Sequence, residues 1–95
     1  MSPREPDPDR EAHFLAMAEL SLEAQALSEA ALLSDWDEVR FRTFRLMEQG
    51  FDLRSRAIAQ TAHDLSLLMG PAGSTPAPGY GAAIAALSQA IGDLI

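Results

Sequence analysis

Cysteine, lysine and asparagine are absent from the 95-residue sequence, and the absences narrow what the chain can be. Without cysteine there is no disulfide framework, no thiolate zinc site and no cysteine nucleophile. The basic residues are all arginines and alanine is abundant, a usage typical of a GC-rich bacterial genome. The fold must therefore depend on packing of apolar side chains alone.

Long hydrophobic runs are also missing. No stretch approaches the roughly 18 to 20 apolar residues that span a bilayer. The first nine residues combine prolines with charged side chains and do not have the pattern of a signal peptide. We therefore expect a cytoplasmic protein that does not enter a membrane.

Positive charge is scarce overall but concentrated in one segment. The net charge is −7, with 47% apolar and 22% charged residues, a composition typical of a globular domain. A net negative chain has no general affinity for nucleic acid or anionic membranes. Residues 40–56 nevertheless hold five arginines against two acids, a local charge of +3 against −10 elsewhere. A local basic face is therefore predicted.

The first helix is predicted to follow a disordered lead, residues 1–8. Asp7 can cap a helix over residues 9–33, and Pro8 suits a first helical position. Its apolar side chains form two stripes, and one partner helix would not cover both. The first stripe is Met17, Leu20, Ala24, Leu27 and Ala31, and the second stripe is Leu15, Leu22, Ala26 and Leu33.

A turn is predicted at Ser34, because a serine followed by three acidic residues within four positions matches a helix start. The second helix should cover residues 35–69 and stop at the Gly70-Pro71 pair. Since no glycine or proline lies near Ser34, one helix continuing through residue 69 is the alternative. The hairpin is preferred because an uncovered rod would leave too much apolar surface in water.

Gly50 has two interpretations. It could end the helix, with Asp52 capping a restart, or it could let another backbone approach an unbroken helix. We favour the unbroken helix because the apolar pattern continues across Gly50. One predicted stripe is Val39, Thr43, Leu46, Gly50, Leu53 and Ala57, and its neighbour is Trp36, Phe44, Met47, Phe51, Ile58, Leu65 and Met69.

Residues 70–81 have the glycine and proline content of a linker. Residues 82–95 follow as a short amphipathic helix, whose apolar stripe should dock on the hairpin, on a second subunit or on a partner. The predicted fold is all-α: an antiparallel hairpin of two long helices plus this C-terminal helix. Because the long helices have surplus apolar stripes, we expect a homodimer that forms a helical bundle.

Enzymatic chemistry is not indicated. His13 and His63 are the only histidines, no Glu-x-x-His pair occurs, and no cofactor or metal is expected. The segment His63-Asp64-Leu65 on a helix resembles histidine phosphotransfer domains, which implies a signalling role for His63. Those domains usually continue with a lysine and a small residue, where this chain has Ser66 and Leu67.

A protein-binding role is the preferred interpretation. Trp36, Phe44 and Phe51 are expected in the core, but Phe41 stands off the stripes between two arginines, a combination enriched in interfaces. We expect a non-catalytic interaction module, such as a small adaptor, chaperone or regulatory subunit. A nucleic-acid-binding regulator using the Arg40–Arg56 face is the alternative. The predicted partner-binding residues are Phe41, Arg40, Arg42, Arg45, Ile84, Leu87, Ile91 and Leu94.

Overall fold

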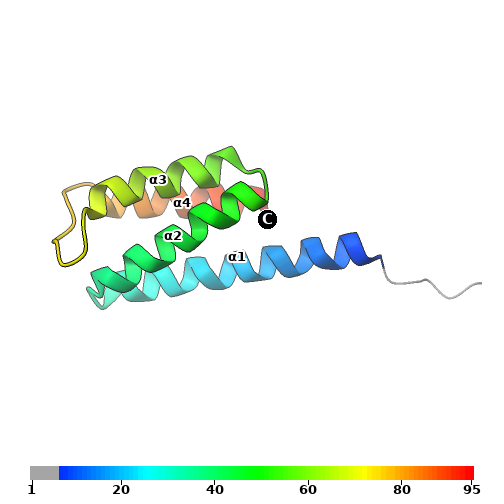
Figure 1. Cartoon of the computed structure of the whole chain (residues 1–95), viewed down its shortest axis with the longest axis horizontal. Helices are drawn as coiled ribbons and strands as arrows, with labels where there is room; N and C mark the ends of the chain where they lie inside the picture. Colours follow the sequence, from blue (N-terminus) through cyan, green and yellow to red (C-terminus); the bar gives the residue numbers. More distant parts are fainter. Residues whose placement is uncertain (1–6) are drawn as a thin grey trace, which may run out of the picture.

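The computed structural model describes residues 7–95 and shows four α-helices, with no strand in that range (Figure 1). Successive helices run in opposite directions, and contacts join α1 to α2, α2 to α3, α3 to α4 and α4 to α1. The protein is therefore all-α, with four helices around one core. The helices are α1 (Pro8–Leu32), α2 (Trp36–Asp52), α3 (Arg56–Met69) and α4 (Tyr80–Leu94).

The start of α1 is set by its capping residues. The Asp7 carboxylate accepts hydrogen bonds from the backbone N–H groups of Asp9 and Arg10, at 3.1 and 3.3 Å. Pro8 occupies the first helical position, where its missing N–H leaves no bond unmade. The helix thus begins one residue earlier than predicted, and residues 1–6 of the predicted lead lie outside the described residues.

The chain turns between α1 and α2 where predicted, but Asp35 caps α2 in place of Ser34. Ser34 adopts the left-handed conformation, with φ of 56°. The backbone N–H of Asp35 then donates to the Ala30 carbonyl at 2.9 Å, and its carboxylate accepts from the Glu38 N–H at 3.3 Å. The alternative of one helix continuing through residue 69 is wrong.

The prediction of an unbroken helix over residues 35–69 is also wrong, because α2 and α3 are separate helices. Arg54 is left-handed, with φ of 55°, and the Ser55 N–H donates to the Gly50 carbonyl at 2.8 Å. The Ser55 hydroxyl accepts from the Ile58 N–H at 3.2 Å and so caps α3. This turn has the same backbone geometry as the turn at Ser34, and in both turns the left-handed residue is not a glycine.

Gly50 does allow a close backbone approach, as predicted, but the backbone is that of the next helix in the same chain. A Cβ at this position would lie 2.7 Å from the backbone nitrogen of Ala59. Gly50 therefore sits where α2 and α3 come together beside their turn. Asp52, the alternative cap for a restart, ends α2 and leaves the capping of α3 to Ser55.

α4 packs on its own chain, against α3 and α1. The linker ends at Gly79, and Tyr80 opens α4 with its ring edge-to-face on Trp36, at 5.2 Å between ring centroids. The C-terminal helix was predicted to dock on the hairpin, on a second subunit or on a partner, and in the structure it docks on helices of its own chain. The buried core consists of Leu20, Leu27, Ala30, Val39, Leu46, Ile58, Ala62, Leu65, Met69, Leu87, Ala90 and Ile91.

The N-terminal part of α1 extends beyond the other helices (Figure 1). Its first buried residue is Leu20, so the preceding residues Pro8–Glu19, called the arm below, contribute nothing to the buried core. The arm projects at the end of the molecule where α2 turns into α3. Ala16 and Met17 are partly covered, but the exposed side chains of Phe14 and Leu15 are left without a partner from their own chain.

Candidate protein interface

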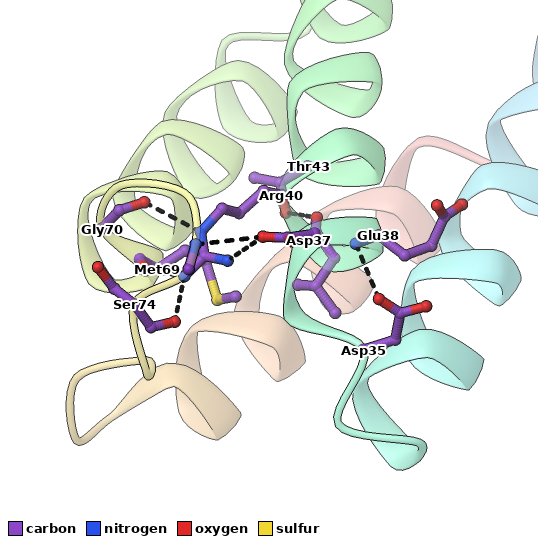
Figure 2. A network of polar contacts seen from close by, with 10 residues as sticks. Asp35, Asp37, Glu38, Arg40, Thr43, Met69, Gly70 and Ser74 are labelled. Carbon is purple, nitrogen blue, oxygen red and sulfur yellow. Dashed lines mark hydrogen bonds and ion pairs between the residues drawn. The ribbon is translucent and has the colours of Figure 1, made fainter.

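Arg40 fastens α2 to the end of α3 and is not placed for partner binding (Figure 2). Its guanidinium donates to the carbonyl oxygens of Met69 at 2.8 Å and Gly70 at 3.1 Å. It also donates to the Ser74 carbonyl and forms an ion pair with Asp37 at 2.8 Å. With only 15% of its side chain exposed, Arg40 is a structural residue of the fold.

Arg42 and Arg45 lie on either side of Glu23, a residue of α1. Arg42 Nη1 is 3.2 Å from Glu23 Oε2, and Arg42 Nε is 2.7 Å from Glu38 Oε1. Arg45 Nε reaches Glu23 Oε1 at 3.6 Å. Hydrogen bonds to Glu23 and then to Glu38 raise the pKa of Arg42 above its ordinary value. Both arginines therefore face α1 and are partly neutralised by it.

Three phenylalanines on α2 remain exposed, and we call Phe41, Phe44 and Phe51 the phenylalanine row. Their exposed fractions are 51%, 56% and 69%. The guanidinium carbon of Arg42 lies 5.3 Å from the centroid of the Phe41 ring, a cation–π distance. The row is an exposed apolar surface of α2, and Phe44 and Phe51 also border hollows between α2 and α3.

The prediction that Phe44 and Phe51 belong to the core is wrong. α2 buries a single narrow side, which matches the first predicted stripe of this helix up to Gly50. Trp36 is only partly buried, against Tyr80. Phe44 and Phe51 instead border hollows between α2 and α3, which α3 does not fill.

The predicted C-terminal stripe is divided between core and surface. Leu87 and Ile91 are buried, Ile84 is partly buried against the core, and Leu94 is exposed at the helix end. The stripe therefore serves packing within the chain. Sequence periodicity could identify the apolar side of this helix but not the surface that covers it.

The second stripe of α1 is exposed along most of its length. Leu15, Leu22 and Leu33 are more than half exposed, and Ala26 is intermediate. Phe14 lies beside Leu15 and is 70% exposed. The first stripe meanwhile packs on the core through Leu20 and Leu27. The second stripe is therefore left largely uncovered by the helices of its own chain.

A groove runs between α2 and α3 near their turn. It has a volume of about 510 Å³, and Met47, Phe51 and Ala59 supply apolar lining. Arg54 and Arg56 supply charge, and no carboxylate lines it. A smaller hollow of about 170 Å³ shares Met47 and continues between the same two helices. We call the larger hollow the α2–α3 groove.

The five arginines of residues 40–56 do not form one face. Arg40 lies against the end of α3, and Arg42 and Arg45 pair with Glu23. Arg54 and Arg56 instead line the α2–α3 groove. Their role was not identified from the sequence, although Ser55 between them is a typical capping residue and could have indicated the turn that places them.

His63 also lines the α2–α3 groove and is exposed. Within residues 7–95, no group of three histidine, aspartate or glutamate side chains is arranged to hold a metal ion. The phosphotransfer interpretation of His63 remains a prediction. In this fold the histidine would act from the wall of a groove that also contains two arginines.

Comparisons with protein-family models, with curated proteins and with solved structures found no match to this chain. None of the helices described for residues 7–95 has the length and apolar character needed to cross a membrane.

Proposed function

We propose that this chain is a non-catalytic protein–protein interaction module, of the adaptor, chaperone or regulatory-subunit kind, that works as a homodimer. The observation that carries the proposal is the phenylalanine row. Three large aromatic side chains exposed on one helix leave more apolar surface in water than a small monomer usually tolerates. Aromatic residues are also the commonest anchors of binding energy in interfaces.

The setting of Phe41 supports a binding role. Its ring lies beside Arg42, and Arg42 is held in turn by Glu23 and Glu38. A side chain that is already ordered loses less conformational entropy when a partner covers it. Arg45 remains nearly half exposed beside this group and offers a cation to an acidic residue of the partner.

The exposed second stripe of α1 supports the dimer. Leu15, Leu22 and Leu33 recur on one side of the helix over its whole length, with no helix of the same chain covering them. Symmetric dimers are the commonest way in which small helical proteins cover such surface.

The dimer is tested by light scattering over a range of micromolar concentrations. We expect a mass twice the 10.2 kDa of one chain. Leu15→Gln, at a position 53% exposed, should preserve the helix content while weakening the dimer. A compact monomer of 10.2 kDa at micromolar concentration would overturn the dimer.

The partner-binding role is tested by photo-cross-linking in cells that express the chain naturally. A photoreactive phenylalanine analogue replaces Phe41, and Gln89, exposed on α4, is the matched control position. We expect a defined adduct with a second protein at position 41, lost on Arg45→Glu, and none at position 89. The same adducts at both positions, or adducts only between copies of this chain, would contradict the adaptor role.

A further inference from the structure

Two features at one end of the molecule have no partner within the chain: the arm of α1 and the α2–α3 groove (Figure 1). The arm cannot fill the groove of its own chain, because α1 packs on α2 and α4 but makes no contact with α3. Each feature combines apolar and charged side chains. They are therefore candidates to cover each other between two copies.

The arm has an apolar side with acidic neighbours. Phe14 and Leu15 are 70% and 53% exposed. Glu11 and Glu19 stand four residues before and four residues after Leu15, so they lie on the same side of the helix. The arm as a whole holds three acidic residues and one arginine. An acceptor surface for it must combine apolar and positive groups.

The α2–α3 groove has that combination. Met47 and Phe51 line it with apolar atoms, and Arg54 and Arg56 line it with positive charge. Neither arginine makes an ion pair within residues 7–95, unlike the three arginines earlier in α2. The charges are thus free to meet the glutamates of another chain.

We propose that the arm of a second copy of this chain lies in the α2–α3 groove, and that two copies exchange their arms reciprocally. This inference rests on the proposed function, because it specifies how the dimer forms. Since arm and groove lie at the same end of the molecule, a twofold axis beyond that end satisfies both contacts at once. Both arms and both grooves are then occupied, so association stops at two copies.

The exchange accounts for both uncovered features. Phe14 and Leu15 leave water against Met47 and Phe51, and the unpacked end of α1 gains a surface to pack on. Glu11 and Glu19 approach Arg54 and Arg56. Pairing two α1 helices through their second stripes would instead bring glutamates toward glutamates, because Glu11 and Glu19 border that stripe.

Charge reversal tests the proposal. The arm variant is Glu11→Arg with Glu19→Arg, and the groove variant is Arg54→Glu with Arg56→Glu. Light scattering and analytical ultracentrifugation give the dimer dissociation constant, and circular dichroism confirms that each variant retains its helix content. An acidic residue at the first position of α3 suits the positive end of that helix, so the groove variant should fold.

Each variant alone should dissociate at least tenfold more readily than the wild-type dimer. An equimolar mixture of the two should recover a dimer, because every arm then meets a groove of opposite charge. A single chain with all four reversals should also recover the homodimer. The control is Glu29→Arg with Gln25→Glu, at exposed positions in the C-terminal half of α1, outside the arm and the groove, and it should leave the dissociation constant unchanged.

A wild-type dimer that neither reversal weakens would overturn the exchange while leaving the dimer of the proposed function in place. Recovery in neither the mixture nor the fourfold variant would also overturn it, because the two surfaces would then not meet. A monomeric wild-type chain would overturn both the exchange and the dimer.

Discussion

Arg40 shows how one side chain connects distant parts of the chain. Met69 ends α3 and Gly70 follows it, so their carbonyl oxygens have no helical N–H partners. A guanidinium presents several N–H donors in one plane and reaches both oxygens together with that of Ser74. Lysine, with its single ammonium group, could not satisfy the same set in the same geometry.

We expect Arg40→Ala to lower the free energy of unfolding by about 2 to 3 kcal/mol, because several charge-assisted hydrogen bonds are lost and carbonyls at the end of α3 lose their partner. Urea denaturation followed by circular dichroism measures the change. Arg45→Ala is the control, since a half-exposed ion pair contributes less than about 1 kcal/mol. Equal losses of unfolding free energy in the two variants would show that the Arg40 contacts contribute no more to stability than a half-exposed ion pair.

Gly50 and Gly92 form a matched pair of helical glycines. Gly50→Ala places a methyl group 2.7 Å from the Ala59 backbone nitrogen, whereas nothing lies within 4 Å of a Cβ at Gly92. We expect Gly50→Ala to lower the unfolding free energy by about 1 to 3 kcal/mol in spite of the higher helix propensity of alanine. Gly92→Ala should raise it by about 0.5 kcal/mol. Thermal unfolding of the two variants measures both effects, and a stabilised Gly50→Ala would contradict the close packing of α2 on α3.

At the scale of single elements, the two turns between helices show why one turn was predicted from the sequence and the other was not. Leu33-Ser34-Asp35 and Leu53-Arg54-Ser55 have the same backbone geometry, each with a left-handed residue before the cap. The first was predicted because acidic residues follow it. The second has arginine at the corresponding position of the new helix and an apolar pattern that continues across the turn, so periodicity alone could not locate it.

The arm is the element whose stability depends most on its surroundings. Pro8–Glu19 has the caps and the residues of a helix but no buried side chain. The arm is the N-terminal half of the 25-residue α1, and a helix end without packing partners frays more readily than a packed segment. The helical state of the arm should therefore depend on association.

We expect hydrogen exchange in the arm to depend on protein concentration, because only the dimer covers it. Arm amides should exchange slowly at concentrations where the dimer forms and quickly after dilution, while amides near Leu20 and Leu27 stay protected in both conditions. Hydrogen-exchange mass spectrometry at two concentrations measures this. Protection of the arm that is the same at both concentrations would contradict a role for the arm in association.

At the scale of the whole molecule, α4 completes the core. Leu87 and Ile91 are buried together with Ile58 and Leu65 of α3. Without α4, the part of the apolar side of α3 that α2 does not cover would be open to water. The C-terminal segment is therefore part of the folding unit and not an appended binding element.

We expect Leu87→Ala to lower the unfolding free energy by about 2 to 5 kcal/mol, since it leaves a cavity in the core. Leu94→Ala, at the exposed end of the same stripe, is the control and should cost less than about 1 kcal/mol. Chemical denaturation at a fixed protein concentration measures the unfolding free energy of each variant. A Leu87 variant as stable as the Leu94 variant would show that α4 is not part of the core.

The sequence by itself determined the all-α class, the first turn, the start of α1 and the apolar side of each helix, because caps and periodicity act over a few neighbouring residues. It also showed that α1 has more apolar surface than one partner can cover. Only the tertiary structure decided that α2 and α3 separate after Asp52, that Arg40 faces inward and that α4 covers its own chain. These outcomes depend on which surfaces meet across the molecule. Local spacing does not contain that information, because an apolar stripe is equally suited to its own core, a second copy or a partner.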